Sequence, residues 1–350
     1  YNSDCQMTVP AGGADRIHFN IAGGGTQTIT VASVLPTINS AMVIDGTTQT
    51  GWVANGFLPV VVDGNGLASA IFTLSATADG STIRGLVLKN TLDDAIDILA
   101  GADGNTIAGN FIGALTSAGV SGGSGAAGQT IYVAGANNTI GGIGIGDRNV
   151  ISGNANNAIW LSGAGATSNL VAGNYIGLNA AGNAAIGNGG VGVYIDNGAS
   201  NNTIGGATAA HRNVIAGNTQ YAVDILDPAT SNNLVQGNYL ATNAAGSAAI
   251  SNGGFGVVVD GGATNTTIKN NLIAGNVNTS WSAIRGGIYI KANGATVQGN
   301  IIGWDATGTV ALGNGGGSIS AGIWEAGTST NILIGGTAAG GLCYLALCLL

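Results

Sequence analysis

The sequence predicts an all-β protein wound as a parallel β-solenoid, and three observations point to this fold class. Short segments recur along the chain after 64 residues, each recurrence contains runs in which apolar residues alternate with others, and 64 of the 350 residues are glycine. With 45% hydrophobic and only 7% charged residues, the chain can form a continuous core and does not have a disordered composition. The absence of a regular every-third glycine excludes collagen, and so much glycine disfavours long helices.

The repeat is most visible where segments keep their sequence. The run NTIGG at 138–142 recurs at 202–206, and GNY at 173–175 recurs at 237–239, both after 64 residues. Repeated units of this kind stack so that each one buries the apolar face of its neighbour. We therefore expect a repeat array over 67–336, preceded by initial coils over 1–66 and followed by an apolar tail over 337–350.

Each 64-residue unit contains two coils, and each coil contributes similar short strands. Alternation with period two predicts strands that bury one face, and equivalent strands on successive coils can pair only in parallel. Second strands are expected at segments such as 169–171 and 232–235. About ten coils, each rising ~4.8 Å, give a rod roughly 50 Å long. The first strands are expected at 96–98, 131–133, 159–161, 193–195, 223–225, 257–259, 288–290 and 323–324.

Asparagines that follow glycine recur at the expected corners of the coils. Asparagine tolerates left-handed backbone geometry, and stacked amides can hydrogen-bond along the solenoid axis. We expect a ladder formed by Asn110, Asn154, Asn174, Asn218, Asn238, Asn276 and Asn300.

Several of these segments resemble a known family of repeats. Three units are similar to the right-handed parallel β-helix repeats of large secreted and surface proteins in bacteria: NNTIGG…RNVISGN (138–154), NNTIGG…HRNVIAGN (202–218) and GNYIGLNAAGNAAIGNGGVGVYI (173–195). The leader over 15–51, which begins DRIHFNIAGGG, is similar to the first coil of such proteins. The resemblance covers about residues 15 to 336 and implies the single-stranded, right-handed β-helix of the pectate-lyase-like superfamily. That superfamily includes lyases, hydrolases, phage tailspikes and adhesins, so the resemblance implies a fold and no particular reaction.

Charge and hydropathy exclude some partners. Sixteen acidic residues against eight Lys and Arg give a net charge of −8 without a basic patch, so nucleic acid is not an expected partner. No apolar run is long enough to span a membrane as a helix. The composition favours an extracellular or cell-surface location.

The acidic residues offer the main catalytic candidates. Asp196, Asp224 and Asp260 are expected on three successive coils, within roughly 10 Å of one another. We interpret them as surface acids near strand ends, and the alternative is a hydrolytic pair or a weak Ca²⁺ site. The further acids Asp93, Asp94, Asp97 and Asp103 are expected to stabilise turns, and a calcium site is the alternative. No other metal site and no cofactor is expected.

Other catalytic signals are weak. Polygalacturonases carry Gly-His-Gly and Arg-Ile-Lys motifs, and this chain has neither. Its two histidines are His18, in the first coil, and His211, which aligns with Asp147 of the preceding repeat. Position 211 therefore behaves as a variable loop position. Whether the chain is an enzyme stays open, with a non-enzymatic role favoured.

Aromatic residues are concentrated at one position of the repeat. The middle residue of each first strand is expected to face outward, and five of eight such positions are aromatic although aromatic residues are only 5% of the chain. Stacking between neighbouring strands is one explanation. A face that contacts sugar rings, another protein or the chain's own loops is the other. The five residues of this predicted binding face are Tyr132, Trp160, Tyr194, Tyr289 and Trp324.

The ends of the solenoid matter because open sheet edges favour association. The apolar tail is expected either to cap the last coil or to pair with the next subunit. The only three cysteines, Cys5, Cys343 and Cys348, lie near the two ends and can form at most one disulfide within the chain. If the tail pairs with the next subunit, Cys5 and either Cys343 or Cys348 can form a disulfide across that joint. A head-to-tail contact of this kind does not close and produces filaments.

These observations predict an extracellular structural or adhesive solenoid that assembles end to end. The competing interpretation is a protein that binds or degrades polysaccharides, or cell-surface glycans, through the aromatic face, with the three aspartates as its candidate acids.

Overall fold

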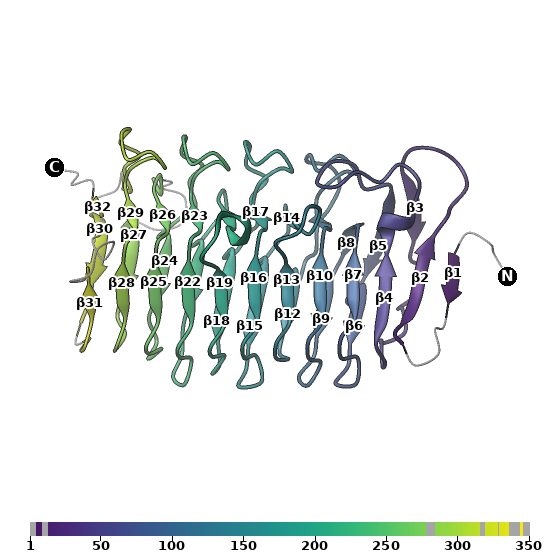
Figure 1. Cartoon of the computed structure of the whole chain (residues 1–350), viewed down its shortest axis with the longest axis horizontal. Coiled ribbons are helices and arrows are strands. Elements are labelled where there is room, and N and C mark those ends of the chain that lie inside the picture. The colour runs from purple at the N-terminus through teal and green to yellow at the C-terminus, as the bar shows by residue number, and fades with distance from the viewer. Residues whose placement is uncertain are drawn as a thin grey trace.

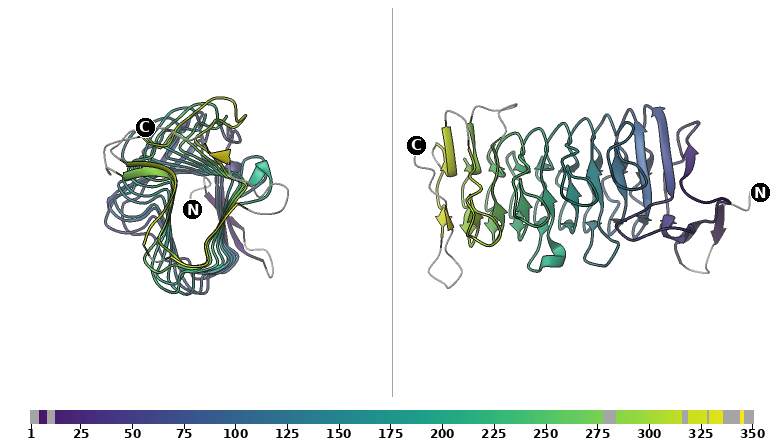
Figure 2. Two further views of the ribbon diagram at one scale, coloured as in Figure 1. Left: turned by 90° about the vertical axis from the view of Figure 1, so that its left-hand side faces the viewer. Right: turned by 90° about the horizontal axis from the view of Figure 1, so that it is seen from above.

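The computed structural model describes residues 5–8, 13–277, 284–315, 319–327, 329–335 and 344–345. The chain is an all-β, right-handed parallel β-helix with three sheets that run along its length (Figure 1). The predicted fold class is therefore confirmed. The end-on view shows the coils lying over one another in close register (Figure 2).

The first sheet has 12 strands and contains the only antiparallel strand pair among the named strands of the described chain, β1 with β2. Its strands, in spatial order, are β1 (Cys5–Thr8), β2 (Asp15–Phe19), β4 (Met42–Asp45), β7 (Thr82–Arg84), β10 (Thr106–Ala108), β13 (Thr139–Gly141), β16 (Leu170–Ala172), β19 (Thr203–Gly205), β22 (Leu234–Gln236), β25 (Thr267–Lys269), β28 (Thr296–Gln298) and β31 (Leu333–Ile334).

The second sheet has 11 strands and follows the first after a sharp corner. Its strands are β3 (Gln27–Thr30), β5 (Val60–Leu67), β8 (Leu86–Thr91), β11 (Phe111–Gly113), β14 (Val150–Ser152), β17 (Tyr175–Ile176), β20 (Val214–Ile215), β23 (Tyr239–Leu240), β26 (Leu272–Ile273), β29 (Ile301–Ile302) and β32 (Tyr344–Leu345).

The third sheet has 9 strands, and two short 3₁₀ turns, η1 (Gly46–Thr48) and η2 (Ala209–His211), lie outside the sheets. Its strands are β6 (Phe72–Leu74), β9 (Ile96–Ile98), β12 (Ile131–Val133), β15 (Ile159–Ser162), β18 (Val193–Asp196), β21 (Val223–Ile225), β24 (Val257–Val259), β27 (Ile284–Ile290) and β30 (Ile319–Glu325).

The core is one continuous stack of aliphatic side chains inside the coils. In the 12-stranded sheet, Ile107, Ile140, Val171, Ile204 and Val235 occupy equivalent positions on successive strands, and all are fully buried. Each such side chain contributes about 1.5–3 kcal/mol through burial alone. The alternating pattern of the sequence thus becomes a column of like side chains.

Buried asparagines form ladders at the corners, but the seven predicted residues do not form a single one. Asn110, Asn174, Asn238 and Asn300 lie in the corner between the 12- and 11-stranded sheets, whereas Asn154, Asn218 and Asn276 lie after the 11-stranded sheet. The full first ladder is Asn110, Asn149, Asn174, Asn213, Asn238, Asn271 and Asn300. The second contains Asn154, Asn188, Asn218 and Asn252, with a separate pair of Asn276 and Asn314.

The Gly-Asn pattern predicts only alternate members of the first ladder, because Asn149 and Asn213 follow arginine and Asn271 follows another asparagine. Where glycine is present it has a steric reason. Gly173 has a φ of 74°, and a Cβ there would collide with the carbonyl oxygen of Gly142 on the preceding coil.

A third ladder precedes the 12-stranded sheet and was not predicted. Its backbone N–H groups donate to the side-chain oxygen of the next member, at separations of 31, 33 and 31 residues from Asn138 onward. The residue just before each ladder asparagine is exposed and has a positive φ; examples are Asn137 (56°) and Asn201 (58°). The Asn-Asn pairs of the sequence therefore place the first residue in the turn and the second in the ladder. Its members are Asn105, Asn138, Asn169, Asn202 and Asn233.

Loops on alternate coils also stack on one another. These loops project from the rod after β11, β17, β23 and β29 (Figure 1). Ala180 N–H donates to Gly119 O at 2.9 Å, Ala244 N–H to Gly182 O at 2.8 Å and Ala306 N–H to Gly246 O at 2.9 Å. The loops thus extend the regular hydrogen bonding beyond the coil.

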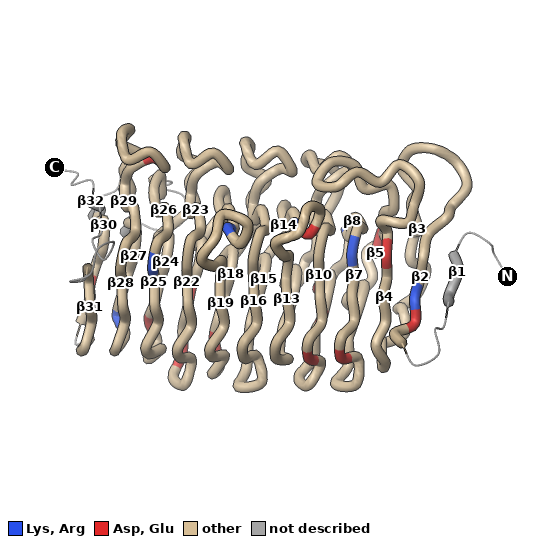
Figure 3. The backbone as a smooth tube through the Cα atoms, viewed as in Figure 1, with Lys and Arg blue, Asp and Glu red and all other residues tan. Residues whose placement is uncertain are grey.

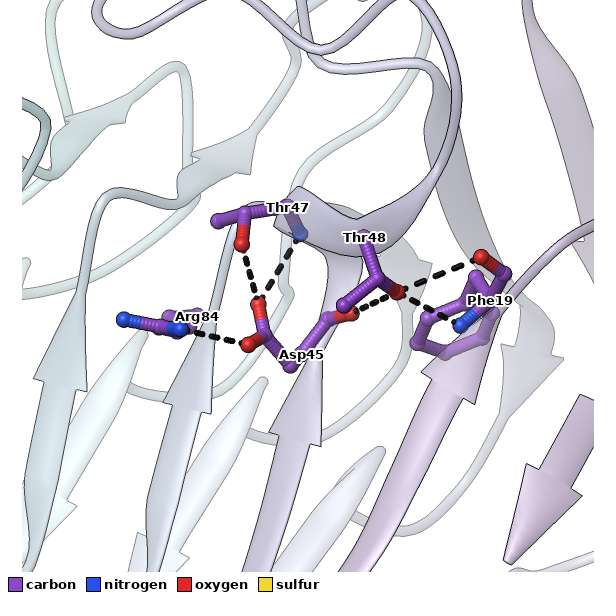
Figure 4. Close-up of polar contacts among 5 residues, drawn as sticks. All are labelled: Phe19, Asp45, Thr47, Thr48 and Arg84. Atoms are coloured by element: carbon purple, nitrogen blue, oxygen red, sulfur yellow. Dashed lines mark hydrogen bonds and ion pairs between the residues drawn. The ribbon is translucent and has the colours of Figure 1, made fainter.

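The N-terminal coils contain an ion pair between the buried Asp45 and the exposed Arg84. Asp45 accepts hydrogen bonds from Arg84 and from the N–H and hydroxyl of Thr47, while Thr48 bridges to Phe19 (Figure 4). Burial alone would raise the pKa of Asp45, but the hydrogen bonds from Arg84 and Thr47 outweigh it and hold that pKa below its usual range.

The C-terminal tail contributes one short strand to the rod. β32 pairs in parallel with β29 of the same chain, which fits the capping interpretation of the tail. Cys343 and Cys348 lie outside the described residues, so the predicted disulfide stays a prediction. Charged residues are thinly spread along the coils (Figure 3). No helix in the described ranges is long and apolar enough to cross a membrane.

Candidate functional site

The outer face of the 9-stranded sheet brings the aromatic candidates and Asp224 into one line, while Asp196 and Asp260 lie two residues further along their strands. The middle residues of its strands pair directly with one another, so consecutive side chains are separated by about 4.8 Å along the rod. We call this line the outer column: Asp97, Tyr132, Trp160, Tyr194, Asp224, Val258, Tyr289 and Trp324.

The rings of the outer column contact each other and remain partly exposed. Tyr132 meets Trp160 edge to face, with ring centres 5.2 Å apart, and Trp160 stacks on Tyr194 at 6.1 Å. Tyr289 meets Trp324 edge to face at 6.1 Å. Stacking between strands and a partly open aromatic face therefore occur together.

Two further aromatic residues, Tyr221 and Phe255, lie beside the pair formed by Tyr289 and Trp324. The sequence pattern did not predict them as part of this face. Phe255 lies 5.5 Å from Tyr289 and 6.5 Å from Tyr221, measured between ring centres. Both residues precede their strands, so period-two alternation gave no signal for them. Burial raises the pKa of Tyr221 to about 12.

Asp196 contacts the aromatic side chains of the outer column. Its Oδ1 accepts a hydrogen bond of 2.8 Å from Trp160 Nε1, and the residue is only 4% exposed. Burial raises the pKa of Tyr194, as does its hydrogen bond and charge interaction with Asp196. Asp196 thus positions two rings of the outer column.

Asp224 is the most unusual acid of this face. It is 5% exposed, and its Oδ1 is buried without a hydrogen-bond partner. Burial raises its pKa to about 7, and the carboxylates of Asp260, Asp196 and Asp227 add to the shift. Near neutral pH, Asp224 therefore exchanges between a neutral form that can donate a proton and a charged form.

Asp260 completes the predicted group of three, at its more exposed edge. It lies 3.9 Å from Lys291 Nζ and accepts a hydrogen bond of 2.6 Å from Gly261 N–H. An open hollow of about 570 Å³ borders it, lined also by Asn293 and Ser329. Asp196 and Asp224 are thus buried, contrary to the prediction of three surface acids, and only Asp260 borders solvent.

The further acids do not act together: the structure pairs Asp94 with Asp97 and places Asp103 in a separate turn. Asp94 and Asp97 share a hydrogen bond between their carboxyl groups, and burial together with Asp97 raises the pKa of Asp94 to about 8. Burial also raises the pKa of Asp97. Asp103, in contrast, accepts from Ala136 N–H at 2.7 Å and stabilises a turn between coils, as predicted.

The remaining candidates lie away from this face. His211 belongs to η2 and its Nδ1 is 2.8 Å from Thr208 Oγ1, and His18 belongs to β2 of the 12-stranded sheet. In the part of the chain that the structure describes, no three His, Cys, Asp or Glu side chains come together as a set of metal ligands.

The architecture places the chain in the class of right-handed parallel β-helix proteins. Solved structures similar to it include the A-modules of the mannuronan C-5 epimerases AlgE6 and AlgE4 of Azotobacter vinelandii, with 15% and 14% identity, a TM-score of 0.48 for each, and coverage of 96% of this chain and 92% of each module. An alginate lyase from Paenibacillus sp. is also similar, with 16% identity, a TM-score of 0.38, and coverage of 87% of this chain and 89% of the lyase chain. At this identity the likeness concerns the fold alone. No protein-family model matches the sequence, and a search of characterised proteins finds no match either.

Proposed function

We propose that the chain binds a polysaccharide along the outer column, outside the cell or at its surface. The observation that carries the proposal is the line of partly exposed rings with carboxyl groups beside it. Sugar rings present apolar C–H faces and hydroxyl groups, which aromatic faces and carboxyl oxygens respectively recognise. A line of such side chains along the rod fits a polymer better than a small molecule.

The charges of this face favour a neutral or amino-sugar polymer. The described charged side chains at the outer column and its flanks are mainly acidic, namely several aspartates and Glu325, with Lys291 as the nearby cation. An anionic polysaccharide would meet like charge there, whereas hydroxyl and ammonium groups would meet hydrogen-bond acceptors.

The proposal predicts that the double variant Trp160→Ala/Tyr194→Ala loses affinity for polysaccharide by more than about tenfold, because both rings lie at the centre of the column. Affinity electrophoresis through gels containing hydroxyethyl cellulose, glycol chitosan or polygalacturonate measures this loss. The matched control is Trp304→Ala, which removes an aromatic residue from a projecting loop outside the 9-stranded sheet.

Retardation of the wild type by a neutral or amino-sugar gel, lost in the double variant and kept in the control, is the expected result. Retardation by polygalacturonate alone would contradict the polymer class. Lack of retardation in every gel, or an equal loss in the control, would overturn the binding proposal. Thermal unfolding of each variant establishes that binding is measured on folded protein.

A hydrolytic form of the same proposal rests on Asp224. A carboxyl group whose pKa lies near neutrality suits a general acid, and Asp196 and Asp260 supply nearby carboxylates. If the chain cleaves its polysaccharide, Asp224→Ala should abolish release of reducing ends while binding in the gels persists. Absence of release by the wild type from all three polymers would reject this form and leave the binding proposal intact.

End-to-end assembly is a second proposal. The last strand of the 12-stranded sheet, β31, leaves Leu333 and Ile334 each 47% exposed, and apolar side chains on an edge strand favour pairing with another chain. Electron microscopy of the purified chain, with and without reductant, should then show filaments with a subunit rise near 50 Å. Discrete short rods would reject assembly.

A further inference from the structure

A pocket between two arginines lies at a corner of the coil that the proposed glycan site does not use. Arg148 and Arg212 line it with Asn55, Gly173 and the loop 142–145. The arginines immediately precede the Asn149 and Asn213 rungs that lead into β14 and β20. Because β14, β17 and β20 pair in that order, the two arginines are held two strands apart, about 10 Å along the rod.

Each guanidinium group is fixed by a tyrosine of the following coil. Arg148 Cζ lies 4.0 Å from the ring centre of Tyr175, and Arg212 Cζ lies 3.9 Å from that of Tyr239. A guanidinium stacked on a ring uses its flat face for that contact and keeps its in-plane N–H donors for other partners. Both guanidinium groups are therefore held in a fixed orientation in the absence of a ligand.

The Nε–H donors of both arginines are not satisfied by the protein. Nε of Arg148 and Nε of Arg212 are both buried without a hydrogen-bond partner. Within the described ranges, neither guanidinium forms an ion pair. A buried donor without an acceptor costs about 1–3 kcal/mol, so two of them beside one pocket require a reason.

Nearby charged and polar groups do not supply the missing acceptors. The Oδ2 atom of Asp147 accepts a hydrogen bond of 2.7 Å from Gly144 N–H, and the His211 ring is paired with Thr208. The rim of the pocket contains Ile145, which is 95% exposed and packs on nothing in the core.

We propose that this pocket binds an oxyanion, namely a phosphate, sulfate or carboxylate group, held by Arg148 and Arg212. The planar guanidinium fork matches two oxygens of such a group, and the partly enclosed position strengthens the charge interaction. The net charge of −8 provides no general attraction for anions, so binding depends on this local pair. The site is independent of the outer column, where the charges are of the opposite sign.

The experiment follows the arginine Nε–H signals by NMR while inorganic phosphate, inorganic sulfate or trigalacturonate is added at constant ionic strength, with maltotriose as the neutral reference. We expect saturable shifts of two arginine signals with at least one of the three anions and none with maltotriose. The variant Arg148→Gln/Arg212→Gln should bind more than tenfold more weakly, as measured by calorimetry. The control Arg16→Gln/Lys269→Gln removes the same charge elsewhere and should bind normally.

Comparing the affinities for the three anions also identifies the source of the oxyanion. Tighter binding of trigalacturonate assigns the pocket to an acidic glycan, and tighter binding of phosphate or sulfate assigns it to the free ion or its esters. If the glutamine variant does not fold, Arg148→Lys/Arg212→Lys keeps the charge and removes the fork, and it should also lose affinity. Shifts that do not saturate, or equal responses in the pocket and control variants, would overturn the proposal.

Discussion

Replacing Asn174 by alanine is expected to lower the free energy of unfolding by on the order of 4 kcal/mol. Asn174 is fully buried in the middle of the ladder between the 12- and 11-stranded sheets. Its Nδ2 donates to the carbonyl oxygens of Ile140 and Ala172 and to Asn213 Oδ1, at 2.8, 3.1 and 3.0 Å. Its Oδ1 accepts from the backbone N–H and Nδ2 of Asn149. Alanine leaves these buried groups without partners, and each one costs about 1–3 kcal/mol.

Urea unfolding followed by circular dichroism measures the effect. Asn20, which is exposed, provides the control, because Asn20→Ala should change stability by less than about 0.5 kcal/mol. Asn300→Ala should fall between the two, since the ladder bonds of Asn300 involve Asn271 on one side. Equal effects at Asn174 and Asn20 would show that the ladder does not stabilise the corner.

The repeat of the sequence predicted the parallel pairing because each coil buries its strands against the next. Strands at 159–161, 193–195 and 223–225 pair in the predicted register, since a shift by one residue would turn the apolar side chains outward. The antiparallel strand β1 was missed, because it lies outside the repeat and no periodic signal marks it. The ladder members after arginine were missed because Gly-Asn is only one way to form the corner.

The candidate sites were less predictable because they depend on side-chain directions between coils. Period two placed Trp160 and Tyr194 in one column, but it could not show that Trp160 donates to Asp196. Nor could it place Arg148 over Tyr175, a contact that requires the pairing of β14 with β17. Contacts of this kind require the register of a neighbouring coil and the rotamer of a long side chain, and a single coil carries information on neither.

Replacing Asp224 by asparagine is expected to stabilise the protein at pH 8 by on the order of 2 kcal/mol and to change little near pH 3. Burial raises the pKa of Asp224 from 3.8 to about 7. Between these values the folded protein keeps a proton that the unfolded chain releases, so the contribution of Asp224 to stability falls as the pH rises through this window. Below it both states are protonated and the contribution disappears. Asparagine resembles the neutral acid in shape and cannot ionise, so the variant avoids the loss.

Thermal and urea unfolding between pH 3 and pH 8 should therefore show a smaller decline for Asp224→Asn than for the wild type. Glu325→Gln removes one exposed acidic group from β30 of the same sheet and should follow the wild-type profile. Parallel profiles for wild type and Asp224→Asn would mean that Asp224 ionises in the folded protein as readily as in the unfolded chain. The buried, unpartnered carboxyl would then not be the proton donor on which the hydrolytic proposal depends, whereas the aromatic column would keep its proposed role in binding.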